Sequence, residues 1–115
     1  MRRCLSDAPG DPLIIHQSFQ GPLPAHYRTV HRWITQQEVN LWTTGNVTHV
    51  PSGLGAAGRI YVTEPGAPKP GGTGPFRVEF AVPGHMLFAA GNTGWLQIVG
   101  PVENTPVLNV RVLKP

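Results

Sequence analysis

One helix start can be located from the run Ile34–Val39, which directly follows an alternating, strand-like stretch at residues 27–33. The hydroxyl of Thr35 can accept a hydrogen bond from the backbone N–H of Glu38, and the Glu38 carboxylate can return to the N–H of Thr35. This capping box predicts a strand that ends immediately before a helix beginning at residue 36. A strand followed at once by a capped helix points to a mixed α and β fold.

The predicted helix runs for about ten residues and ends near Gly45, which is a natural left-handed C-cap. Val39, Leu41 and Trp42 are its apolar residues and are expected to form its buried side. The preceding strand, Tyr27 to Trp33, places His31 and Arg32 near its end.

Four further segments alternate or are rich in β-formers and are bounded by glycine or proline. In one of them Phe76, Val78, Phe80 and Val82 fall on a single face, which is therefore expected to be the core face. The segment 64–75 contains four prolines and cannot be a helix, so the strands around it are expected to pair in antiparallel fashion. The fold class predicted is α+β, with a twisted, mostly antiparallel sheet of about five strands and one main helix packed on it. The four segments are residues 59–63, 76–82, 95–99 and 107–113.

A chain of 115 residues is long enough for one modest hydrophobic core and not for two. Residues 1–24 carry four prolines and only a short apolar patch, so they are expected to be an irregular lead-in or linker. Residues 25–115 are expected to form the single domain.

Charge and cysteine content exclude several classes of protein. The formal charge of +3 and the pI near 9.6 favour anionic partners only mildly. Cys4 is the single cysteine, so no internal disulfide is available, and no Cys/His spacing suggests a metal site. No apolar window approaches the roughly 18 residues that a membrane span needs, so a soluble chain without a membrane partner is expected.

Histidine and arginine side chains supply the candidate chemistry. Cleavage of RNA without a metal needs a base for the 2′-hydroxyl, an acid for the leaving oxygen and a cation for the developing phosphorane charge. His31, His49 or His85, together with Arg32 or Arg77, would provide these groups.

The solvent side of the sheet offers candidate binding residues. Arg77 and Glu79 lie on one side of their strand, and Arg59 and Tyr61 are related in the same way on the preceding strand. If those strands pair, the four side chains form one polar face, either a cleft floor or simply the solvated side of the sheet. Trp33, next to the strand-end arginine, is the tryptophan best placed to stack on a base or a nicotinamide ring.

The order of these elements resembles that of the C-terminal toxin domains of bacterial polymorphic toxins, the variable ends of rearrangement-hotspot and contact-dependent-inhibition proteins. The resemblance spans roughly residues 27–113. It is carried by the first strand with its arginine, the capped helix, the Gly- and polar-rich loop at residues 46–58, and the segments Gly58–Thr63, Phe76–Pro83 and Asn109–Val112.

Within that group the layout is most similar to the ADP-ribosyltransferase-like toxins. The resemblance implies that a first-strand Arg or His holds NAD, that a later Tyr, Ser or Thr contacts the nicotinamide ribose, and that a late-strand Glu stabilises the oxocarbenium-like transition state. The late strand carries Gln97 where this glutamate is expected, which leaves Glu79 or Glu103 as substitutes. The matching positions for the first two roles are His31 or Arg32 and Tyr61 or Thr63.

The resemblance therefore implies an interbacterial toxin that transfers ADP-ribose from NAD, its co-substrate, to a nucleic acid or protein target. Such a domain is delivered to the target-cell cytoplasm as part of a larger secreted protein and has an immunity protein as a partner. The alternative toxin is a metal-independent ribonuclease of the barnase and colicin-nuclease type, which needs no cofactor. A third expectation is a binding domain without enzymatic activity.

Overall fold

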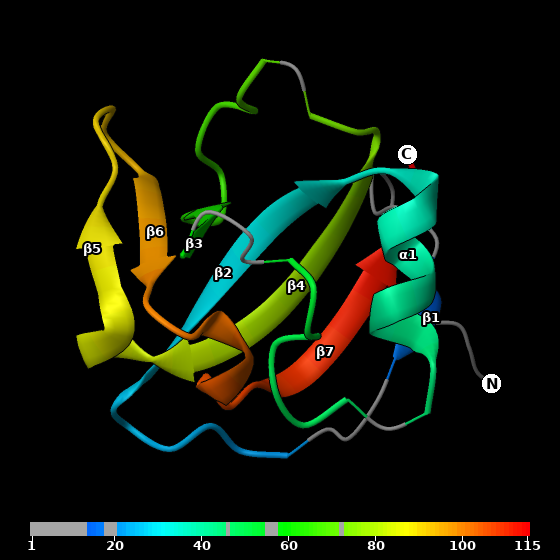
Figure 1. Ribbon diagram of the computed structural model, residues 1–115, viewed down its shortest axis with the longest axis horizontal. Helices are drawn as coiled ribbons and strands as arrows, with labels where there is room; N and C mark the ends of the chain where they lie inside the picture. Colours follow the sequence, from blue (N-terminus) through cyan, green and yellow to red (C-terminus); the bar gives the residue numbers. More distant parts are fainter. Residues whose placement is uncertain (1–13, 18–20, 46, 55–57, 72) are drawn as a thin grey trace, which may run out of the picture.

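The computed structural model describes residues 14–17, 21–45, 47–54, 58–71 and 73–115. In this part of the chain one α-helix lies against an antiparallel sheet (Figure 1). The helix is α1 (Gln36–Thr43), and two short 3-10 turns are η2 (Gly84–Met86) and η3 (Val102–Asn104). The strands are β1 (Ile14–Gln17), β2 (Tyr27–Ile34), β3 (Arg59–Thr63), β4 (Phe76–Pro83), β5 (Leu87–Ala89), β6 (Trp95–Val99) and β7 (Leu108–Leu113).

The seven strands form one sheet in the order β1-β7-β4-β2-β3-β6-β5, and every neighbouring pair is antiparallel. The predicted α+β class, with a mostly antiparallel sheet and one main helix, is confirmed. The two strands beyond the predicted five are the short edge strands β1 and β5. The strand β1 arises from residues 14–17, within the segment expected to be an irregular lead-in, where Ile14 and His16 align with β7.

The central strand of the sheet is β2, and it separates β3 from β4. All eight residues of β2 are aligned with β4, from Tyr27 opposite Pro83 to Ile34 opposite Phe76. Consequently β3 and β4 do not pair with each other, although they follow each other in sequence, so the pairing that the predicted polar face required is absent. The chain between β3 and β4 therefore connects two strands that lie on opposite sides of β2.

In the core, α1 packs against the face of the sheet formed by β2, β4 and β7 (Figure 1), and the same buried cluster continues over β3 and β6 with Ile60, Val62 and Ile98. Trp42 is fully buried and stacks on Phe80, with ring centroids 4.8 Å apart. Val39 is buried beside it, because residues three apart share one side of a helix. The expectation that Leu41 is buried is wrong: it is 42% exposed, since its position points away from the side shared by Val39 and Trp42.

The cap of α1 forms at the predicted residue. The hydroxyl of Thr35 accepts a hydrogen bond from the backbone N–H of Glu38 at 3.3 Å. The helix ends at Thr43, and Gly45 follows with φ of +68°, the left-handed conformation expected for it. Within the described residues, no helix has the length and apolar character needed to cross a membrane.

Candidate functional site

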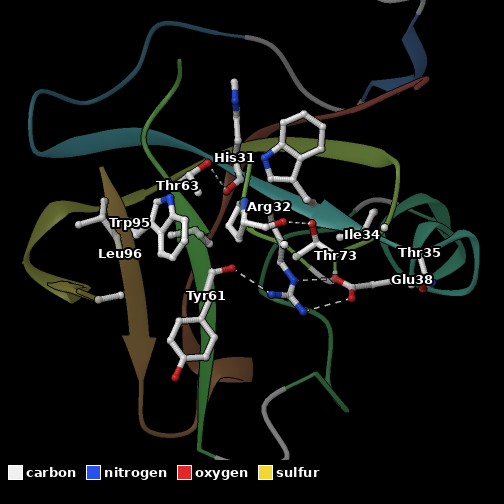
Figure 2. Close-up of a pocket in the computed structure, with 16 residues that line it drawn as sticks. His31, Arg32, Ile34, Thr35, Glu38, Tyr61, Thr63, Thr73, Trp95 and Leu96 are labelled. Atoms are coloured by element: carbon white, nitrogen blue, oxygen red, sulfur yellow. Dashed lines mark hydrogen bonds and ion pairs between the residues drawn. The ribbon is translucent and has the colours of Figure 1, made fainter. Parts of the chain in front are cut away.

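A pocket of about 490 Å³ lies where β2 and β3 separate (Figure 2). These strands share a single aligned pair, His31 opposite Thr63, so the residues beyond that pair leave a gap. The pocket is lined by residues 31–35, Glu38, residues 61–63, Pro70, Gly71, Thr73, Gly74, Ala90 and residues 95–96.

The Arg32 side chain crosses this gap and joins three elements. Its Nε donates to Oε2 of Glu38 at 2.7 Å and its Nη2 donates to Oε1 at 3.2 Å. Its Nη1 donates to the backbone oxygen of Tyr61 in β3 at 3.0 Å. Figure 2 shows the guanidinium held between Glu38 and Tyr61. The pocket therefore contains a fixed, side-on Arg–carboxylate pair.

The Glu38 carboxylate was expected to accept a hydrogen bond from the backbone N–H of Thr35. In the structure it instead accepts hydrogen bonds from other side chains. In addition to Arg32, it accepts a hydrogen bond from Nε1 of Trp42 at 3.1 Å. A two-point ionic bond to arginine outweighs a single capping bond to a backbone N–H, which explains the difference. Glu38 is thus a pocket carboxylate that the sequence reasoning missed. Its position could have indicated the Arg32–Glu38 pair, because Glu38 lies in the first turn of the helix that directly follows the strand carrying Arg32.

His31 projects from the opposite face of β2, because neighbouring strand residues alternate. Its Nε2 lies 3.0 Å from Oε1 of Glu79, and Nε of Arg111 donates to Oε2 of Glu79 at 3.0 Å. The hydrogen bond with His31 and the bond and charge of Arg111 lower the pKa of Glu79 from 4.5 to about 2, although partial burial acts in the opposite direction. Glu79 is therefore a firmly ionised carboxylate at neutral pH.

The Trp33 side chain projects from the same face of β2 as that of His31, and Trp33 also lines the pocket. Nζ of Lys69 is 5.1 Å from its ring centroid, and Cζ of Arg77 is 5.5 Å from it. Within the described residues, Nε1 of Trp33 and Nε of Arg77 are buried without a hydrogen-bond partner. The indole ring expected to stack on a substrate ring thus contacts two cations of the protein itself.

Two predicted residues of β3 also reach the pocket. Tyr61 is 54% exposed, whereas Thr63 is almost fully buried, with its hydroxyl 3.5 Å from the backbone oxygen of His31. The pocket thus brings together five residues that the sequence analysis selected: His31, Arg32, Trp33, Tyr61 and Thr63.

Other predicted residues do not line this pocket. Gln97 accepts from Arg59 at 3.2 Å and donates to the backbone of Ala89 in the edge strand at 3.0 Å. His49 precedes β3, forms an isolated β-bridge with Pro106 and lies 3.0 Å from the hydroxyl of its neighbour Thr48. Glu79, Arg77, His85 and Glu103 are also absent from the lining.

Pro70, Gly71, Thr73 and Gly74 line one side of the pocket, and Gly74 lies very close to the end of β2. A Cβ atom at Gly74 would overlap the backbone carbonyl of Ile34 and the N of Thr35. The hydroxyl of Thr73 donates to the backbone oxygen of Pro70 at 2.8 Å and stabilises the loop next to this crossing. Only glycine lets the two backbones approach this closely.

Among the residues that the structure describes, no group of three His, Cys, Asp or Glu side chains is arranged to bind a metal ion. Comparisons of the chain with protein-family models, with curated proteins and with solved structures found no match.

Proposed function

We propose that this chain is an antagonistic bacterial toxin domain that binds NAD in the pocket between β2 and β3 and transfers its ADP-ribose to a macromolecular target. One observation carries the proposal. The side chains that the resemblance implies for NAD binding, His31 or Arg32 and Tyr61 or Thr63, come from two different strands and line one pocket. In the same proposal the domain reaches the target cell as part of a larger secreted protein and is blocked by an immunity protein.

The volume and the lining of the pocket support the proposal that it binds a dinucleotide. Its volume of about 490 Å³ falls within the range of small-molecule sites. Trp95, whose Nε1 donates to the backbone oxygen of Pro68 at 3.0 Å, supplies an aromatic wall, and Arg32 supplies a cation. Transfer breaks the bond between nicotinamide and C1′ of the ribose. The nicotinamide leaves with the bonding electrons, and the acceptor forms the new bond to C1′ and loses a proton.

A carboxylate near C1′ stabilises the positive charge that develops in such a transition state. The late strand carries Gln97 where the resemblance implies this carboxylate, with Glu79 or Glu103 as substitutes, but none of the three lines the pocket. Glu38 is the acidic residue that does, and its two oxygens are already oriented by Arg32 and Trp42. We assign the role of charge stabilisation to Glu38.

The test measures release of nicotinamide from NAD, and labelling of bacterial lysate by NAD tagged on the adenine ring. Purified wild-type protein is compared with Arg32→Gln and Glu38→Gln, each checked for folding by circular dichroism. We expect the two variants to lose at least about a hundredfold in rate, as when one transition-state contact is removed. Arg28→Gln is the matched control, because Arg28 pairs with Glu64 outside the pocket and is exposed. Absence of both nicotinamide release and labelling by the wild-type protein would refute the proposal.

One observation favours a second candidate, a metal-independent ribonuclease. His31, Glu79 and Arg111 lie in adjacent strands on the face of the sheet that faces away from α1, and they are joined at 3.0 Å. They are the kinds of group that RNA cleavage needs. The lowered pKa makes Glu79 a weak base, which places this candidate second. Degradation of total RNA in the presence of a chelator, abolished in Glu79→Gln, would support it. A chain that consumes neither NAD nor RNA is a binding domain.

A further inference from the structure

Lys69 and Arg77 form a pair of cations that no carboxylate neutralises within the described residues. The ion pairs there join other side chains of the sheet to carboxylates, namely Arg28 to Glu64, Arg32 to Glu38, and both His31 and Arg111 to Glu79. Arg59 donates to the amide oxygen of Gln97. Neither Lys69 nor Arg77 takes part in any of these interactions. Both instead lie over the ring of Trp33, at 5.1 and 5.5 Å from its centroid.

The strand register explains why Arg77 has no acidic partner. It is aligned with Trp33 across β2 and β4, and Glu79 lies two residues further along on the same face of β4. The carboxylate of Glu79 is occupied by His31 on one side and Arg111 on the other. The region around Trp33 therefore has excess positive charge.

Trp33 connects this charge to the pocket, because it lines the pocket and also contacts both cations. We infer that Trp33, Lys69 and Arg77 hold the phosphate backbone of a nucleic-acid strand at the edge of the pocket. We further infer that the strand held there is the acceptor of ADP-ribose, and this part of the inference rests on the proposed function. Binding of the strand itself is independent of it.

Three properties of the cluster suit a phosphodiester. The planar guanidinium of Arg77 presents several donors to a phosphate, and the ammonium of Lys69 adds a point charge. Contact with the indole ring holds both groups in place, so less conformational freedom is lost on binding. A phosphate would also supply the negative charge that the described carboxylates do not provide there.

The experiment measures binding of a fluorescent single-stranded RNA of about 12 nucleotides by anisotropy, without NAD, from about 50 to 200 mM salt, the range over which such contacts weaken strongly. We expect the double variant Lys69→Gln, Arg77→Gln to bind at least about tenfold more weakly. Its slope of log affinity against log salt should fall by about 1.4, since each contact to a single strand contributes about 0.7.

Arg28→Gln is the control of equal charge for each single substitution. Arg28 lies five residues before Trp33 and on the other face of β2, so its loss should change affinity by less than about twofold. Lys69→Glu is a second test that does not depend on Arg77 packing, because Lys69 is exposed, and it should weaken binding more than Lys69→Gln. No RNA binding by the wild-type protein at low salt, or equal binding by the double variant and Arg28→Gln, would overturn the inference.

Three further outcomes separate this inference from its alternatives. If the double variant loses affinity for NAD as much as for RNA, the cations serve the diphosphate of the dinucleotide and the inference fails. If tagged NAD labels protein but not RNA or DNA, nucleic acid is not the acceptor and that part of the inference fails, while strand binding and the proposed transfer stand. If RNA binding depends on the cluster but no NAD is consumed, the strand-binding site stands and the transfer fails.

Discussion

Replacing Glu79 by Gln is expected to remove the stabilisation that this carboxylate provides at neutral pH and loses on acidification. The pKa of Glu79 lies at about 2 in the folded protein, against an ordinary value of 4.5, because His31 and Arg111 stabilise the ionised form. Each pKa unit corresponds to about 1.4 kcal/mol, so the ionised carboxylate stabilises the fold by about 3 kcal/mol.

The pKa shift also fixes the direction of the pH dependence. The pKa is lowered on folding, so this stabilisation is fully present above about pH 5 and is lost as the pH falls towards 2. Integrating between the two pKa values gives a loss of about 2 kcal/mol by pH 3. At pH 7, Glu79→Gln should lower the free energy of unfolding by about 3 kcal/mol, and the gap to the wild-type protein should narrow to about 1 kcal/mol at pH 3.

The assay is urea unfolding followed by tryptophan fluorescence at pH values from 7 to 3. The matched control is Glu64→Gln, which breaks the Arg28–Glu64 pair, whose side chains are 49% and 47% exposed. An exposed pair of this kind contributes at most about 1 kcal/mol, so this variant should follow the wild-type protein at every pH. A difference between wild type and Glu79→Gln that stays constant from pH 7 to pH 3 would show that the carboxylate is not held as described.

Two further predictions concern packing around the pocket and the helix. Gly74→Ala should lower the free energy of unfolding by at least about 2 kcal/mol, because its Cβ would overlap the Ile34 carbonyl, whereas Gly71→Ala, with nothing within 4 Å, should be nearly neutral in thermal unfolding. Trp42→Ala should cost about 3 to 5 kcal/mol and Leu41→Ala less than about 1 kcal/mol in urea unfolding, since only the first is buried; similar costs for both would contradict the assigned buried side of α1.

The parts of the fold that depend on neighbours in sequence were predictable from the sequence. The cap at Thr35 depends on groups within one helical turn, and the core face of β4 depends on simple alternation, as the burial of Val78 and Phe80 shows. The edge strands β1 and β5 were missed because each is only three or four residues long and is specified by its partner strand.

Strand order was the main feature that local patterns did not contain. The proline-rich loop 64–75 looked like a simple connection between two paired strands, but β2 enters between them. The choice of partner for β2 depends on side chains distant in sequence, such as His31 with Glu79, 48 residues apart.

The candidate site was predictable in part for the same reason. The position of His31 and Arg32 near the end of a strand was predictable from the alternating pattern of residues 27–33 and from the helix cap at Thr35. The partner of Arg32 was not, because Glu38 satisfied a capping pattern equally well, and only the separation of β2 from β3 shows that its carboxylate faces a pocket.

The narrow junction between β2 and β3 divides the sheet into two unequal blocks. Strands β1, β7, β4 and β2 form one block with α1, and β3, β6 and β5 form the other. One aligned residue pair and the Arg32 side chain bridge them directly at the pocket. A molecule bound there contacts both blocks and holds them together. Its binding should therefore slow amide hydrogen exchange more strongly at this junction than in the strands further out.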